Sequence, residues 1–178
     1  MARSNEPIRK AKIDDTPTGK QPADGGWWIL NLEEIGWSTL PGGGTWCMFD
    51  ARSPLLGIGV HILGPGETPG MYHAENNQEG FLVLSGDCLA IVEGEERRMR
   101  AWDYLHCPPG TAHITIGAGD GPCAILMVGT RRPDEVIDYL PEPAAQKYGA
   151  AVDELTHEPR VAYAGRPPRT EVRSPWPL

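Results

Sequence analysis

Residues 81–128 read FLVLSGDCLAIVEGEERRMRAWDYLHCPPGTAHITIGAGDGPCAILMV, and this stretch decides the fold. It consists of short apolar segments, each of which ends at glycine, proline or a cluster of charged residues. Strands spaced by roughly 8–12 residues, with turn formers between them, are typical of an antiparallel sandwich or barrel. No stretch between these segments is long enough for a repeated strand–helix–strand unit. The sequence therefore predicts an all-β fold.

Alternation along the first of these segments indicates how it is buried. In an extended chain, every second side chain lies on the same face. If Glu79 faces the interior, Phe81 and Val83 do so as well, while Leu82 and Leu84 face the other way. Both faces of this strand are then apolar, and both must be covered. Either the terminal segments or a second subunit supplies that cover, and we expect a homodimer.

The composition changes on either side of this central region. Residues 1–26 mix basic, acidic, Thr, Gly and Pro residues without periodicity and are predicted to be a flexible N-terminal tail. Residues 27–140 are predicted to form the barrel. Residues 141–178 are predicted to hold a short helix, with Pro143 near its first position and Gly149 just past its end, followed by an extended proline-rich segment.

Length and charge restrict the function further. A chain of 178 residues has the size of one domain, and 40% hydrophobic residues suffice for a packed core. The net charge of −8 repels phosphate backbones and anionic lipids, so we expect no nucleic-acid partner and no membrane partner. The start of the chain lacks the apolar core of a signal peptide, which predicts a cytoplasmic location. The cysteines show no metal-finger spacing and are expected to be free thiols: Cys47, Cys88, Cys107 and Cys123.

Potential metal ligands lie in and beside this central region. His73 and Glu75 are two residues apart, so on a strand both side chains can converge on one point. Glu79 opens the next apolar segment. A tight turn at 108–110 leads to His113 at the start of another strand. Two imidazoles and one or two carboxylates from separate strands would form a nitrogen and oxygen site for a divalent metal.

These residues resemble the first motif of the cupins, a family of small β-barrels or jelly rolls. That motif runs Gly-x5-His-x-His-x(3,4)-Glu-x6-Gly. Glu79 and Gly86 match its end, His73 falls at its first histidine, and Glu75 stands at its second. The segment from 65–66 to His73 is one residue too long, which a bulge near Gly70 can absorb.

The alternative register, set from the glycine, would turn Tyr72 and Ala74 inward instead of His73. We favour the register set from Glu79, because it fills three of the four ligand positions with residues able to bind a metal.

The second cupin motif, Gly-x5-Pro-x-Gly-x2-His-x3-Asn, is matched by Pro108, Gly110 and His113. Trp102 stands where this motif opens with Gly, and Gly117 stands where it closes with Asn. The resemblance spans about residues 65–129. It implies a cupin jelly-roll barrel, a double-stranded β-helix, with a short C-terminal helix and extended tails.

The resemblance also implies one divalent metal ion, held by His73, Glu79 and His113, with Glu75 in a histidine's place. Two imidazoles with carboxylates suit Fe(II), Mn(II), Ni(II) or Zn(II). Glu75 is either a fourth ligand or points to solvent and leaves three. The alternative to a metal site is a degenerate barrel, in which these groups hydrogen-bond to each other or to a ligand.

The function implied by the resemblance is that of a metal-dependent enzyme of dioxygenase or isomerase type, acting on a small oxygenated organic molecule. The alternative is a non-catalytic module that binds a small molecule, and a structural role with a vestigial site is a third reading. No general base can be named, so catalytic residues beyond the metal ligands stay unknown. His61 and His106 are expected to be strand or packing residues. Four further side chains either line a pocket or only fill the barrel: Tyr72, Phe81, Thr115 and Met127.

Overall fold

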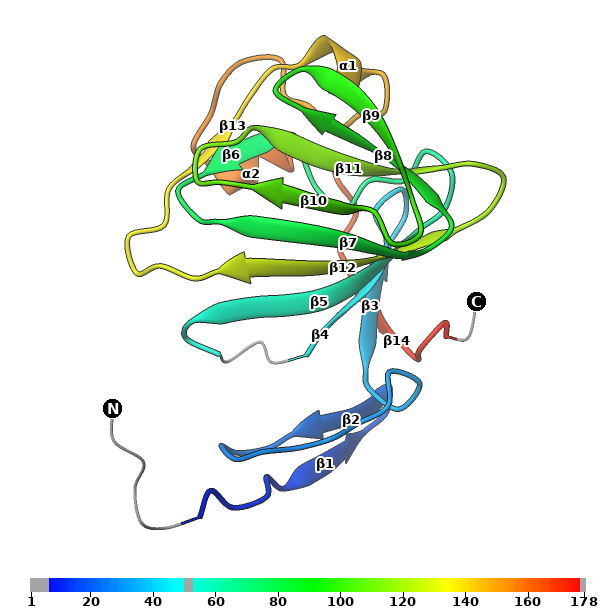
Figure 1. The fold of residues 1–178 in the computed structure, drawn as a ribbon, viewed down its shortest axis with the longest axis vertical. Coiled ribbons are helices and arrows are strands. Elements are labelled where there is room, and N and C mark those ends of the chain that lie inside the picture. The colour runs from blue at the N-terminus through cyan, green and yellow to red at the C-terminus, as the bar shows by residue number, and fades with distance from the viewer. Residues whose placement is uncertain (1–6, 50–52, 177–178) are drawn as a thin grey trace.

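The computed structural model describes residues 7–49 and 53–176, and its regular structure consists mainly of antiparallel strands (Figure 1). The predicted all-β fold is confirmed. The strands are β1 (Ile13–Thr16), β2 (Gly19–Pro22), β3 (Trp37–Leu40), β4 (Gly44–Met48), β5 (Leu56–Leu63), β6 (His73–Glu75), β7 (Glu79–Ser85), β8 (Asp87–Val92), β9 (Glu95–Arg100), β10 (Tyr104–Cys107), β11 (His113–Ala118), β12 (Cys123–Thr130), β13 (Ile137–Tyr139) and β14 (Thr170–Val172).

Two sheets form the body of the molecule. The seven-stranded sheet has the order β10-β7-β12-β5-β4-β3-β14, and the five-stranded sheet has the order β13-β6-β11-β8-β9. Strands that follow one another in sequence often lie in different sheets, as β6 and β7 do, so the chain crosses repeatedly between the two layers (Figure 1). The turn between β8 and β9 is a tight hairpin turn, with Glu93 and Gly94 at φ 49° and 77°.

The space between the sheets holds an apolar core. Phe81 and Val83 of β7 contribute to it from one sheet, and Cys88 and Ala90 of β8 contribute from the other. Glu79 therefore lies on the inward-facing side of β7, as the alternation predicted. Because this core fills one part of the barrel, polar side chains on the same inward faces gather in the remaining part.

The outer faces of both sheets are covered by the chain itself. On the larger sheet, Val60 and Ile62 pack with Trp37 of β3 and with Leu30 and Trp176, which come from segments near the two ends. On the smaller sheet, the outward side chains of β8 and β11 pack against α1 (Pro143–Gln146) and the residues that follow it. Terminal segments thus supply the cover that the apolar faces require. The homodimer stays a prediction.

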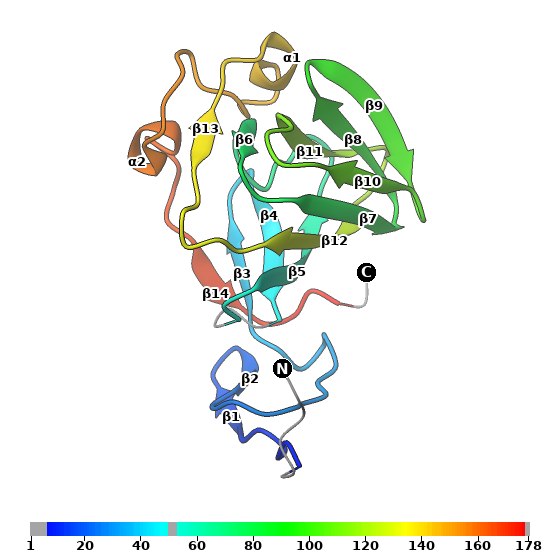
Figure 2. The same cartoon turned by 60° about the vertical axis from the view of Figure 1, so that its left-hand side comes forward.

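The two ends contain more regular structure than the sequence analysis predicted. Within residues 7–26, β1 and β2 form a hairpin that lies outside the barrel (Figure 1). The C-terminal segment contains a second short helix, α2 (Pro159–Ala162), beside β13 (Figure 2), and β14, which pairs with β3. The expected short helix is α1, where the Glu142 side chain accepts a hydrogen bond from the Ala144 N–H. Neither helix in the described chain is long enough to cross a membrane.

Candidate metal centre

Three of the predicted ligands come together at one end of the barrel. His73 on β6 pairs directly with His113 on β11, and their ring centroids are 5.0 Å apart. Glu79 reaches the same point from β7 in the facing sheet. One possible ligating atom from each of these residues lies within 4.8 Å of those of the other two. The site therefore joins the two sheets.

Backbone carbonyls fix the orientation of both imidazoles. His73 Nδ1 is 2.7 Å from the Met71 carbonyl oxygen, and His113 Nδ1 is 3.0 Å from the Thr111 carbonyl oxygen. A carbonyl oxygen can only accept, so Nδ1 must carry the donated proton in each ring. In a neutral imidazole Nε2 is then the atom with a free lone pair. Bonds of this kind orient the histidine ligands of metal sites.

Glu79 and His113 face each other in an arrangement that calls for a cation. Glu79 Oε2 is 3.0 Å from His113 Nε2, yet it is buried and has no well-aligned hydrogen-bond donor. Two lone pairs at this separation repel unless a positive charge lies between them. The separation also suits two ligand atoms that each contact one metal ion at about 2.1 Å. The donor set therefore fits a divalent metal.

The pKa shifts follow from the same arrangement. Burial opposes the charged form of His113, but the Cys107 thiol and the Glu79 carboxylate beside it outweigh burial and raise its pKa to about 10. Burial likewise opposes the charge of Glu79, while His113 and His73 hold the pKa of Glu79 below its ordinary value. Burial and the neighbouring His113 lower the pKa of His73. A metal ion bound to His113 would take the place of the proton that charges its ring.

Glu75, the other predicted ligand, lies beside Glu79 but outside the cluster of three. Burial, followed by the charges of Glu79 and Glu135, raises the pKa of Glu75 to about 8. Glu135 is held in place by the Asn77 side-chain amide, which donates to its Oε1 over 3.2 Å. Glu75 thus lies next to the cluster of three residues, and its role as a fourth ligand stays a prediction.

Sequence reasoning missed several neighbours of the centre. Cys107, predicted only to be a free thiol, pairs with Glu79 across β10 and β7 and contacts His113. Glu135 and Tyr139 come from the segment after the barrel, and the Tyr139 ring lies 6.1 Å from that of His73. No local sequence pattern predicts that Glu135 and Tyr139 lie here, because it is the pairing of β13 with β6 that brings their segment to the site.

A cavity of about 120 Å³ adjoins the three candidate ligands. Phe81, Thr115 and Met127 line it, whereas Tyr72 faces the outer cluster, where its hydroxyl accepts from the Gly94 N–H. The remaining lining residues are His61, Pro69, Gly70, His73, Glu79, His113, Ile114 and Tyr163. His61 therefore lines the cavity and also packs against Trp46, while His106 is exposed on β10.

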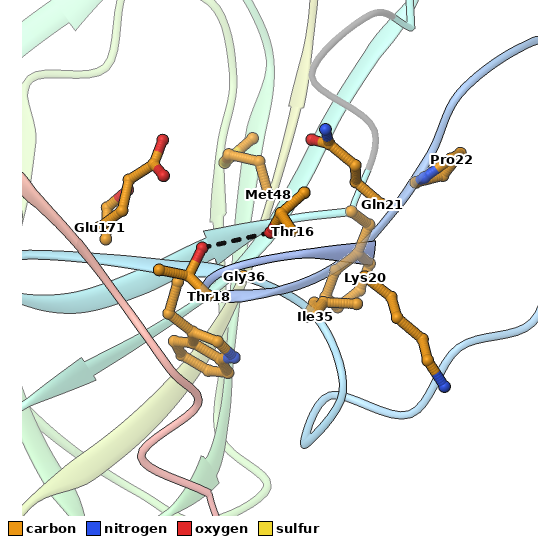
Figure 3. A pocket seen from close by; sticks show the side chains of 12 residues that line it. Thr16, Thr18, Lys20, Gln21, Pro22, Ile35, Gly36, Met48 and Glu171 are labelled. Atoms are coloured by element: carbon orange, nitrogen blue, oxygen red, sulfur yellow. Dashed lines mark hydrogen bonds between the residues drawn. The ribbon is translucent and has the colours of Figure 1, made fainter. Parts of the chain in front are cut away.

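A second cavity, of about 200 Å³, lies between the β1–β2 hairpin and the barrel (Figure 3). Its hydroxyl groups bond to one another, with Thr16 Oγ1 and Thr18 Oγ1 3.4 Å apart. None of the predicted metal ligands lines it. The chemistry is therefore concentrated in the cavity beside His73, Glu79 and His113.

Comparison with known proteins gives the same picture. Residues 59–129 match the Cupin_2 family, described as "Cupin domain". Gentisate 1,2 dioxygenase 1 of Aquipseudomonas alcaligenes is 27% identical over 101 residues, which cover 57% of this chain and 28% of that protein. This chain thus spans well under a third of the length of its curated relative.

Two solved structures share the fold. KdgF from Halomonas sp. has 23% identity and a TM-score of 0.51, over 62% of this chain and 98% of that one. A cupin-superfamily sugar phosphate isomerase from Silicibacter pomeroyi has 24% identity and a TM-score of 0.50, over 53% of this chain and 64% of that one. The motif residues, the two-sheet barrel and the match agree: residues 59–129 match a Cupin_2 domain, and the chain has the fold of a cupin barrel.

Proposed function

We propose that this protein is a metal-dependent enzyme that acts on a small oxygenated organic molecule. One divalent ion, Fe(II), Mn(II), Ni(II) or Zn(II), is held by His73, Glu79 and His113, with Glu75 as a further ligand. The reaction is of dioxygenase or isomerase type. The relative named as a gentisate dioxygenase supports the first type, and the fold shared with a sugar phosphate isomerase is compatible with the second.

The observation that carries this proposal is the orientation of the two imidazoles. Each Nδ1 is tied to a backbone carbonyl, and the buried Glu79 Oε2 lies 3.0 Å from His113 Nε2 without a well-aligned donor. Here the groups are preorganised as ligand atoms, which lowers the cost of binding an ion.

A metal ion bound at this centre supplies a Lewis acid that polarises oxygen atoms of a bound molecule. The protein's own residues do the rest. Met71 and Thr111 carbonyls hold the rings of His73 and His113 in position. Phe81 and Met127 line the adjoining cavity with apolar surface and exclude water from it.

The test is elemental analysis by plasma mass spectrometry on untagged protein purified without chelators. We expect about one equivalent of Fe, Mn, Ni or Zn per chain, and a reduction of at least tenfold in the His113→Ala variant. His106→Ala is the matched control, because His106 is an exposed histidine that lies on β10. Wild-type protein that takes up none of these metals, even on soaking, would overturn the proposal.

A metal-loaded protein also allows the reaction type to be assigned. Dioxygen consumption separates the oxygenase from the isomerase class. Metal bound at one equivalent without turnover of any oxygenated substrate would leave the non-catalytic binding module as the function. An active, metal-free His113→Ala protein would exclude metal-dependent catalysis altogether.

A further inference from the structure

Buried polar atoms without hydrogen-bond partners are concentrated at one place in the described part of the chain. They are His61 Nδ1, Glu79 Oε2 and Thr115 Oγ1, and all three residues line the cavity of about 120 Å³. Buried polar groups are nearly always paired in folded proteins, so each exception needs an explanation. The metal accounts for Glu79. The other two atoms remain to be explained.

Thr115 is placed in the cavity by the alternation of β11. His113 and Thr115 lie two residues apart and face the interior, while Ile114 and Ile116 belong to the outer cluster against α1. Thr115 is only 1% exposed, so bulk water does not reach its hydroxyl. A hydroxyl can both donate and accept, and this one does neither within the protein.

His61 reaches the cavity from the facing sheet. It lies on β5, opposite Ile125 of β12, and its ring stacks on Trp46 with centroids 6.1 Å apart. Burial lowers the pKa of His61 to about 4, so its imidazole is neutral at neutral pH. Together, Thr115 and His61 present uncharged hydrogen-bonding groups to whatever fills the cavity.

The rest of the cavity wall carries no positive charge that could bind an anion far from the metal. Among the described residues, its lining includes no lysine and no arginine. Arg166 lies behind the wall, where its Nη2 donates to Thr68 Oγ1 and to the Gly70 carbonyl oxygen. Phe81 and Met127 provide apolar surface between the polar groups. Such a lining suits a neutral oxygen and disfavours a phosphate ester.

We propose that Thr115 and His61 bind a neutral hydroxyl or carbonyl oxygen of the substrate, while other oxygens of the same molecule reach the metal. This inference rests on the proposed function, whose site it extends. It narrows the substrate class to compact oxygenated molecules that are uncharged at the end away from the metal. The small volume agrees, because pockets for drug-sized ligands measure about 300–1,000 Å³.

The test uses matched pairs of probes on Mn(II)-loaded protein. Glycolate, 3-hydroxypropanoate and 4-hydroxybutanoate are each compared with the acid that carries a methyl group in place of the hydroxyl. Relaxation of the probe's protons by Mn(II) reports binding near the metal, and titration gives the dissociation constant. We expect the hydroxyl member of at least one pair to bind about tenfold more tightly than its partner, which corresponds to about 1.4 kcal/mol.

Thr115→Val removes the hydroxyl with little change of shape and should reduce this preference to about twofold. Thr115→Ser keeps the hydroxyl and should retain the preference. Thr45→Val is the control, because Thr45 donates to Thr39 Oγ1 on the β3–β4 hairpin and does not line the cavity. In ligand-free protein, Thr115→Val should also raise Tm, since it removes an unpaired buried hydroxyl, whereas Thr45→Val should lower it.

The outcomes separate the two proposals. Metal bound at one equivalent, with no preference for any hydroxyl member or with a preference that survives Thr115→Val, overturns the role of Thr115 and leaves the metal centre intact. Protein that binds no metal overturns both, because the carboxylate end of the probe then has no anchor. A lower Tm in Thr115→Val than in wild type would mean that the hydroxyl is paired within the protein and is not reserved for a ligand.

Discussion

At the scale of single residues, the metal centre depends on where two imidazole protons lie. His73 and His113 each begin a strand, and each donates from Nδ1 to the carbonyl two residues earlier. The same local conformation therefore serves both ligands and directs each Nε2 toward Glu79. A substitution that disturbs either turn would change ring orientation without touching a ligand.

His61 gives a prediction about pH. Burial lowers its pKa from 6.5 to about 4, so the folded state binds this proton less readily than the unfolded state does. The contribution of neutral His61 to stability is complete above pH 6.5 and is lost as the pH falls toward 4. Between pH 7 and pH 5 the loss should be about 2 kcal/mol. Urea unfolding of chelator-treated protein at both pH values measures it.

His61→Leu should lose about 2 kcal/mol less than wild type over this interval, because leucine has no proton to bind. The ionisable groups that share its cavity, His73, Glu79, His113 and Tyr163, are present in both proteins, so the comparison isolates His61. His106→Leu is the control and should keep the full loss, since His106 is exposed. An equal loss in His61→Leu and wild type would show that His61 is not held neutral by burial.

The sequence predicted the candidate ligands better than their surroundings. Motif spacing placed His73, Glu79 and His113 together, because alternation and a tight turn are local properties that survive in the fold. The sequence left open whether Thr115 lines a pocket or only fills the barrel. Glu135 and Tyr163 were not predicted, since loops of the later chain bring them to the site.

At the scale of elements, the two departures from the second cupin motif have different consequences for the backbone. Gly117 stands in place of Asn, and a Cβ there would lie 2.0 Å from the Gly64 carbonyl oxygen. Its N–H donates to the Glu67 carbonyl, while its own carbonyl accepts from the Gly66 N–H. The loop before β6 therefore packs directly on the β11 backbone, and no side chain fits.

Trp102 stands where the motif has Gly, in the turn between β9 and β10, at φ 77°. This left-handed conformation costs a non-glycine residue about 1–2 kcal/mol. Glycine avoids that cost, but it loses more conformational entropy on folding, which offsets part of the gain. The indole is 78% exposed, so little burial is lost with it. We expect Trp102→Gly to stabilise the protein by about 0.5–1 kcal/mol in urea unfolding.

Trp102→Ala is the matched comparison, because it removes the indole and keeps the Cβ that causes the strain. It should give no gain. If both variants destabilise the protein equally, the indole makes contacts that matter more than the backbone conformation, and the strain argument is wrong.

Elements outside the barrel were harder to predict than those within it. The segments IDDT and GKQP, which form β1 and β2, are polar and lack the alternation that reveals a half-buried strand. Their hairpin forms through the turn between them, where Thr16 Oγ1 donates to the Gly19 carbonyl and accepts from the Gly19 N–H. By contrast, α1 was predictable, because Pro143 and Gly149 mark its ends in the sequence.

At the scale of the whole molecule, the fold joins two sheets that are each covered on the outside by the chain's own segments. Apolar outer faces alone therefore do not require a partner. The predicted homodimer must instead use other surface. Exposed side chains such as Ile8, Ile29 and Trp27 lie toward the N-terminal end, on and beside the hairpin segment, and are the apolar surface available there.

A metal ion bound at this centre should hold the two sheets together, because His73 and His113 belong to one sheet and Glu79 belongs to the other. A ligand that binds only the folded state at about 100 times its Kd stabilises that state by about 2.7 kcal/mol. For a domain of this size, that corresponds to a rise in Tm of about 5–10 °C. Thermal unfolding with and without saturating Mn(II) or Zn(II) measures the shift.

Variants then assign the shift to individual ligands. His113→Ala should abolish the rise in Tm, because the ion then loses a ligand from the five-stranded sheet. Glu75→Gln should reduce it only if the Glu75 carboxylate is a fourth ligand, as we expect. A shift that survives His113→Ala unchanged would place the metal elsewhere on this acidic protein. Since an ion bound at the surface does not join the sheets, only the interior site links metal binding to the closure of the barrel.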